Sequence, residues 1–217
     1  MENQNLQNNE EALKSEFLNV STEIGEIALD SILTDGIFKD LPLIGPLISS
    51  VKFCKSASDY LLLRRLLIFI NTLDFQSENE IKIFKEKYFK IEDYQRIGAK
   101  ILFAIEKADN ELKIEWLSKS LNLLIDRKIN ANEFLRITSI INSSFPSDAE
   151  KISVFNKRER ITSTNDLIDK HVLDHLYSIG LLSTGGFDGG DAAGKNAGTV
   201  FILNKFGKLF LEKYLEE

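Results

Sequence analysis

The sequence predicts a mainly α-helical protein that ends in a small α+β domain of the winged-helix kind. Apolar residues recur at helical spacing over most of the chain, and only three prolines interrupt 217 residues. Runs typical of β-strands occur only near the C-terminus, on either side of a glycine-rich segment. We therefore expect N-terminal amphipathic and apolar helices over residues 1–75, a helical bundle over 76–150 and a winged-helix-like domain over 151–217.

The composition is that of a folded protein, with 43% hydrophobic and 28% charged residues. The single cysteine, Cys54, cannot form an internal disulfide, and residues 1–11 are too polar and acidic for a signal peptide. A cytoplasmic protein is the expectation. The net charge is −6, with the acidic excess in residues 1–75 and a balance of signs in residues 151–217. Bulk charge therefore does not indicate nucleic-acid binding, which would have to be local.

A helix is predicted to begin at Glu10, because apolar residues follow it at alternating spacings of four and three. This helix either packs on its own domain or forms a seam between subunits. An acidic stripe lies on its opposite face, formed by Glu23, Glu26 and Asp30. The stripe is either a solvated face or, in a ring of subunits, the lining of a pore that favours cations.

A proline-punctuated apolar hairpin is predicted over Leu41–Leu73. Its second half, Tyr60–Leu73, is apolar on nearly every side except at Arg64 and Arg65, which indicates burial in protein or in lipid. A membrane-spanning helix needs about 20 predominantly apolar residues, and both apolar runs are shorter. Two adjacent arginines in mid-span are also costly in lipid unless they are paired. The hairpin is thus either plain core or a segment that inserts only conditionally.

The central block is predicted to be entirely helical. Asn130 and Glu133 have the spacing of a capping box at the start of the last of these helices. Trp116 is expected to anchor the core of the block. The predicted helices span residues 78–90, 92–108, 111–127 and 131–144.

The C-terminal part is predicted to run helix, strand, loop, strand, helix. A recognition-type helix over Asp166–Ile179 should end at Gly180. Strands Leu181–Thr184 and Thr199–Leu203 flank a glycine-rich loop, and Asn204 is a good N-cap for a last helix that ends near Leu215. This order of elements predicts the winged-helix-like domain.

Two motifs in this part fall short of known chemistry. Gly189–Asn196 nearly spells a phosphate-binding loop, but Asn196 replaces the Ser or Thr that holds magnesium, and a strand follows instead of a helix. His171 and His175 lie four apart, as in a zinc site, but the chain has no third His. No nucleophile–base pair, paired carboxylate or redox motif is evident. We therefore expect no enzyme, no catalytic residue, no metal and no cofactor.

The basic residues of this part are the candidate ligand site. In a winged helix they lie near a phosphate backbone, where contacts position the ligand without reading its sequence. The alternative is a solvated charged surface, since acidic residues are interspersed. The candidates for binding a nucleic-acid or other phosphate-bearing ligand are Lys157, Arg158, Arg160, Lys170, His171, Lys195, Lys205 and Lys208.

Three functions remain open on these grounds. The first is a gated membrane effector, in which the apolar hairpin forms a pore and the C-terminal domain senses a ligand. The second is a winged-helix DNA-binding transcriptional regulator, and the third is a structural interaction protein. A regulator has no need of the apolar hairpin over Leu41–Leu73, and this favours the effector.

The run Leu29–Gly45, LDSILTDGIFKDLPLIG, resembles the N-terminus of small bacterial proteins found in defence-type settings. The layout of the whole chain is similar to that of the effector subunit of Hailong-type anti-phage systems. This resemblance implies an oligomeric membrane channel that a DNA oligomer, made by a partner nucleotidyltransferase, keeps inactive. We accordingly expect a homo-oligomer, with a tetramer favoured. Its ligand would be a short single-stranded DNA oligomer, and on activation it would move from the cytoplasm to the inner membrane.

Overall fold

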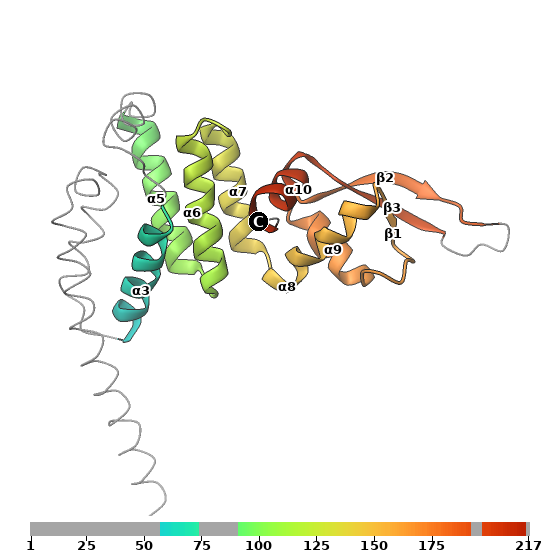
Figure 1. The fold of residues 1–217 in the computed structure, drawn as a ribbon, viewed down its shortest axis with the longest axis horizontal. Coiled ribbons are helices and arrows are strands. Elements are labelled where there is room, and N and C mark those ends of the chain that lie inside the picture. The colour runs from blue at the N-terminus through green and yellow to red at the C-terminus, as the bar shows by residue number, and fades with distance from the viewer. Residues whose placement is uncertain (1–56, 74–90, 192–196, 216–217) are drawn as a thin grey trace, which may run out of the picture. The chain divides into compact units, whose positions relative to one another are not determined.

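A computed structural model describes residues 57–73, 91–191 and 197–215 (Figure 1). Several predictions fall outside these residues: the helix that begins at Glu10, most of the apolar hairpin and the helix over 78–90. The same holds for four candidate site residues, Glu23, Glu26, Asp30 and Lys195. The chain forms two compact units, Met1–Glu106 and Lys107–Glu217. The described residues are mostly helical, with one small antiparallel sheet, as the sequence predicts at this coarse level.

The first unit contains α3 (Ala57–Asn71) and most of α5 (Ile91–Lys107), whose bounds match the predicted helix over 92–108. The buried residues of α3 include Leu66, Phe69 and Ile70, but Leu61 is 43% exposed. Protein therefore covers α3 on one side only at the positions described. No helix within the described ranges is long and apolar enough to span a membrane.

Arg65 in α3 has a specific hydrogen-bond partner. Its Nη1 atom donates to the main-chain carbonyl of Glu106 at 2.8 Å. Glu106 lies in the last turn of α5, where carbonyl groups have no partner within the helix and where a cation is favourable. The arginine thus has the kind of partner that a charge inside an apolar segment requires.

The second unit begins with an antiparallel pair of helices, α6 (Glu111–Ile125) and α7 (Ala131–Ser143). The predicted capping box is present: the Asn130 side chain accepts from the Glu133 main chain, and the Glu133 side chain accepts from the Asn130 main chain. Short helices follow in α8 (Pro146–Ala149) and the 3-10 helix η1 (Glu150–Lys157).

The recognition-type helix is shorter than predicted. It is α9 (Lys170–Ser178), so the prediction of helix over residues 166–169 is wrong. The Asn165 side chain closes residues 165–168 into one turn: its Oδ1 accepts from the main chain of Leu167 and Ile168 at 2.6 and 2.9 Å, and its Nδ2 donates to the Ile168 carbonyl at 3.3 Å. Because this side chain occupies the Ile168 carbonyl, the first helical hydrogen bonds start at the Asp169 carbonyl, and α9 begins later than predicted. The helix ends at Gly180, as predicted, with φ +90°.

The sheet consists of β1 (Ile161–Thr162), β2 (Leu182–Asp188) and β3 (Gly198–Leu203). All pairs are antiparallel and the strand order is β1-β3-β2. β2 continues through Gly185, Gly186, Phe187 and Asp188, which the sequence assigned to the loop. Figure 1 shows the β2–β3 hairpin projecting away from α6 and α7.

The chain ends with α10 (Lys205–Phe210) and the π-helical turn η2 (Leu211–Leu215), and Asn204 is the predicted N-cap. Trp116 is fully buried, as predicted, and its ring contacts the Phe210 ring edge to face at 4.8 Å between centroids. Phe210 stacks on Tyr214 at 4.6 Å. These aromatic contacts join the C-terminal helix to α6, so the helix pair and the sheet share one core.

Candidate nucleic-acid interface

The first group of predicted ligand residues precedes β1. Lys157 is the last residue of η1, Arg158 is its C-cap, and both side chains are exposed with no partner among the described residues. The exposed side chain of Arg160 places Nη2 3.7 Å from the Asp188 carboxylate. Because Asp188 is the last residue of β2, this ion pair joins the basic group to the outer end of the hairpin.

The second group lies at the start of α9. Lys170 is the first residue of the helix, and its ammonium is 2.5 Å from the carboxylate of Asp174, one turn further on. His171 is exposed and has no partner among the described residues. The His171 imidazole and the exposed Lys170 side chain of this group both face solvent.

His175, one turn after His171, belongs to a different arrangement. Its Nδ1 is 2.7 Å from a carboxylate oxygen of Asp148, and its Nε2 is 3.1 Å from the carbonyl oxygen of Ser143. Both ring nitrogens are thus engaged within the protein, and the ring joins α9 to the end of α7, through Ser143, and to α8, through Asp148. Across the described ranges, no group of three or more His, Cys, Asp or Glu residues has the geometry to hold a metal ion.

The third group lies on α10. Lys205 forms an ion pair with Glu133, whose other carboxylate oxygen accepts from the Asn130 main chain at 2.9 Å. These bonds, first that of Lys205 and then that of Asn130, lower the pKa of Glu133 below its usual value. Lys208 is exposed and has no partner within the described ranges. Lys205 therefore serves the packing of α10 on α7 whether or not it also contacts a ligand.

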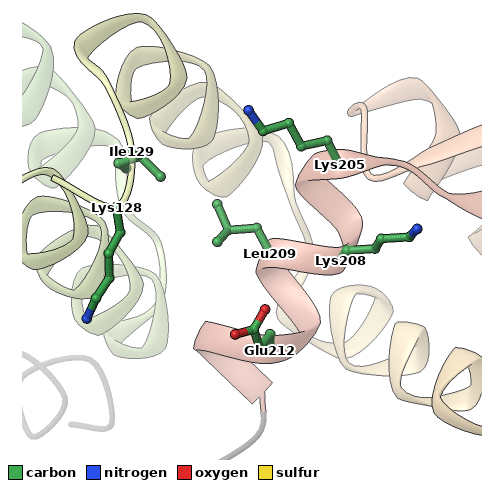
Figure 2. Close-up of a pocket in the computed structure, with 6 residues that line it drawn as sticks. All are labelled: Lys128, Ile129, Lys205, Lys208, Leu209 and Glu212. Carbon is green, nitrogen blue, oxygen red and sulfur yellow. The ribbon is translucent and has the colours of Figure 1, made fainter.

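An open pocket of about 460 Å³ lies beside α10 (Figure 2). Ile129, from the connection between α6 and α7, and Leu209 face each other across it (Figure 2). Figure 2 shows the three lysine ammonium groups at its rim pointing in different directions. The pocket therefore does not gather its cations around one anion. The polar residues at the rim are Lys128, Lys205, Lys208 and Glu212.

The predicted residues thus lie at different places along the hairpin. Leu182 pairs with Leu203 at its inner end, where α10 begins, and Asp188 pairs with Gly198 at its outer end. The Arg160 guanidinium lies beside Asp188 at the outer end, whereas Lys205 and Lys208 lie on α10, after the inner end. Arg160 and these two lysines therefore do not form one site.

One further residue at the outer end, Phe187, is not among those predicted from the sequence. Phe187 is 75% exposed, the largest exposed fraction among the large hydrophobic residues described. It sits next to Asp188, between Gly185-Gly186 and Gly189-Gly190. A lone aromatic residue inside a glycine-rich segment was the available signal, because such a segment has no neighbouring side chains to bury the ring.

No protein-family model, curated protein or solved structure matches this chain.

Proposed function

We propose that this protein is a bacterial anti-phage defence effector. It forms a homo-oligomeric membrane-disrupting ion channel, and a bound DNA oligomer holds that channel inactive. The observation that carries the proposal is α3, an apolar helix that protein covers on one side while Leu61 stays exposed. One of its charged residues, Arg65, donates to a main-chain carbonyl, a contact that can break without leaving a buried charge pair. Such a helix suits a segment that is covered at rest and released on activation.

The C-terminal domain would supply the sensor, with a winged-helix-like fold. The strand order β1-β3-β2, the packing of α9 against β2 and the projecting hairpin support this assignment. One feature departs from it: between β1 and β2 the described chain has the single helix α9, whereas a helix-turn-helix needs two. The Asn165 turn occupies the place of the first helix.

This departure favours a short single-stranded ligand over a sequence-specific duplex. A recognition helix enters the major groove when a second helix crosses the DNA backbone and supports it. Without that support the exposed cations Lys157 and Arg158 are better suited to backbone phosphates, which position a ligand without specifying its sequence. The alternative function, a winged-helix transcriptional regulator, accordingly ranks second.

Gating then follows from a difference in affinity between two states. If the closed oligomer binds the DNA oligomer more tightly than the open one, the ligand shifts the population toward the closed state. Loss of the ligand, made by a partner nucleotidyltransferase, releases the apolar N-terminal region to the inner membrane. The proposed resting form is a cytoplasmic homo-oligomer, with a tetramer favoured.

Two measurements on the full chain test this proposal. Native mass spectrometry should show a homo-oligomer, and a monomer at every concentration would overturn the channel. Fluorescence anisotropy with a short labelled oligothymidylate should show binding that the variant K157E/R158E/R160E weakens by about tenfold or more, with a smaller salt dependence. The matched control is K151E, a charge reversal at another exposed lysine of η1. Equal weakening by K151E, or none by the triple variant, would move the ligand site elsewhere.

A further inference from the structure

Phe187 stands in open surroundings at the outer end of the hairpin. Its side chain is 75% exposed, and glycine pairs flank it on both sides in the sequence. A Cβ atom built at Gly186 or at Gly189 would meet no atom within 4 Å. Among the described residues, the ring is therefore largely open to solvent, and the glycines beside it leave room around the main chain.

A register shift in the hairpin decides which face the ring occupies. Thr184 pairs with Phe201 and Phe187 pairs with Thr199, so β2 takes three steps where β3 takes two. Directly paired residues share a face, and so do residues two apart on one strand. Phe187 therefore lies on the same face of the sheet as Phe201.

That face carries a second exposed aromatic ring. Tyr177, from α9, is 48% exposed, and its ring lies 6.2 Å from the Phe201 ring in an edge-to-face arrangement. Tyr177 and Phe187 thus lie on one side of the sheet, one over its covered part and one toward its projecting end. Figure 1 shows α9 beside the sheet and the hairpin extending beyond it.

A guanidinium group lies near Phe187, at the residue that follows it in β2. Asp188, the next residue, holds the Arg160 guanidinium with a separation of 3.7 Å. The Arg160 side chain is 69% exposed, so its guanidinium is open to a ligand as well as to Asp188. An exposed aromatic ring near an exposed guanidinium is a combination by which proteins bind single-stranded nucleic acids, with bases stacked on aromatic side chains and phosphates near basic ones.

The small extent of the apolar surface argues against a protein partner. A stable protein–protein interface buries about 800 Å² on each side. The described residues around Phe187 offer no such area, because four glycines contribute no side chain and Thr184 and Asp188 are polar. One exposed ring matches one nucleobase in size.

We propose that Phe187 is a stacking platform for one base of a single-stranded nucleic acid, whose neighbouring phosphate contacts Arg160. The inference rests on the proposed function, because it names a contact to the ligand of that same site. It assigns the binding of a base to the ring and the binding of a phosphate to the Arg160 guanidinium. These two contributions can be measured separately.

The test compares two oligomers of equal length, an oligothymidylate and an abasic oligomer with the same phosphates. Fluorescence anisotropy on the full chain gives the Kd of each. F187A should weaken oligothymidylate binding by about tenfold, the order expected for losing one stacked base, and should leave abasic binding unchanged. F187W should retain the affinity, and its added tryptophan emission should be quenched when oligothymidylate binds.

The matched control is F145A. Phe145 is 60% exposed in the same unit, but it precedes α8 and its ring lies against His175 at 5.2 Å. It should bind both oligomers as the unmodified chain does. Unfolding curves for F187A and F145A establish that both variants are folded at the temperature of the assay.

Four results would overturn the inference. The first is that F187A binds oligothymidylate as tightly as the unmodified chain; the proposed function still stands if K157E/R158E/R160E weakens that binding. The second is that the unmodified chain binds the abasic oligomer as tightly as oligothymidylate, which assigns the whole affinity to phosphates. The third is that F187A changes the oligomer mass and leaves binding unchanged, which makes the ring a contact between copies. Absence of binding to either oligomer by the unmodified chain would overturn the DNA-gated function as well.

Discussion

The two ends of the β2–β3 hairpin differ in nearly every interaction they make. At the inner end, Leu182 pairs with Leu203 and is almost fully buried, and the chain continues directly into α10. At the outer end, Phe187 and Asp188 pair with residues next to the glycine-rich turn, and Phe187 is exposed. The same two strands thus carry a buried junction at one end and a solvent-facing surface at the other.

The inner end is fixed by a single side chain with several bonds. Asn204 donates through Nδ2 to the carbonyls of Gly180 and Leu182, at 2.8 and 3.2 Å. Its Oδ1 accepts from the main chain of Phe206 and Gly207 and caps α10. Because one side chain holds the main-chain groups of this junction in four hydrogen bonds, the junction has little conformational freedom. Changes at the inner end should therefore alter the free energy of unfolding. Changes at the outer end should alter ligand binding instead.

The largest expected difference is between two phenylalanines. Phe210 is buried against Trp116 and Tyr214, so F210A should lower the free energy of unfolding by about 3–5 kcal/mol. F187A should change it by less than about 0.5 kcal/mol, because its ring is exposed. Urea denaturation followed by circular dichroism gives both values. Similar losses for the two variants would contradict the division between the ends.

Two glycines allow the same comparison between the inner and outer ends, with a smaller expected difference in the free energy of unfolding. A Cβ atom at Gly207 would overlap the carbonyl oxygen of Leu181, a main-chain atom that cannot move aside easily. G207A should therefore cost about 1–3 kcal/mol of unfolding free energy. G189A adds a methyl group in open space and should be close to neutral. A neutral G207A would show that the Leu181–Gly207 contact is not close in solution.

Tyr214 should make the stability of the inner end sensitive to alkaline pH. Its hydroxyl lies 2.7 Å from the Ser120 hydroxyl in the core, and burial raises the pKa of the phenol well above its usual value. The folded state keeps a proton that the unfolded chain loses above about pH 10, so the contribution is present below that pH and is lost as the pH rises further. Y214F should cost about 1 kcal/mol at neutral pH and should be less sensitive to alkali. Identical alkaline unfolding of both proteins would contradict the buried placement.

Glu133 should give the smallest effect, at acid pH. Its pKa is lowered by Lys205 and by the Asn130 main chain, so its contribution is present above the usual glutamate pKa and is lost as the pH falls below it. E133Q keeps an amide able to complete the capping box and removes the charge, so it should cost less than about 1 kcal/mol at pH 7. The gap in stability between E133Q and the unmodified chain should close on acidification. A gap that persists at low pH would mean that the charge is not its source.

The sequence predicted those features that local rules determine. The Asn130–Glu133 capping box, the Asn204 N-cap, the end of α9 at Gly180 and the burial of Trp116 all follow from one residue type at one spacing. Each depends on hydrogen bonds to main-chain groups a few residues away, on the conformation of one glycine or, for Trp116, on the apolar character of the side chain.

The features that the sequence did not predict depend on competing hydrogen bonds or on partners that are distant in the sequence. The Asn165 side chain closes residues 165–168 into a turn and bonds to the Ile168 carbonyl, so α9 begins after this turn, which helical periodicity does not reveal. The exposure of Phe187 depends on the register shift between β2 and β3. For the candidate site, the ion pairs of Arg160 with Asp188 and of Lys205 with Glu133 join residues far apart in the sequence. Spacing alone therefore grouped cations that lie at opposite ends of one hairpin.

The central claim, an apolar region restrained by a nucleic-acid ligand, is tested most directly by leakage of a trapped dye from anionic liposomes. The full-length protein should release the dye when added alone. Short single-stranded oligothymidylate added beforehand should suppress the release in proportion to the protein that it occupies. Leakage that is the same with and without the oligomer, or no leakage together with sequence-specific binding of duplex DNA, would contradict the account.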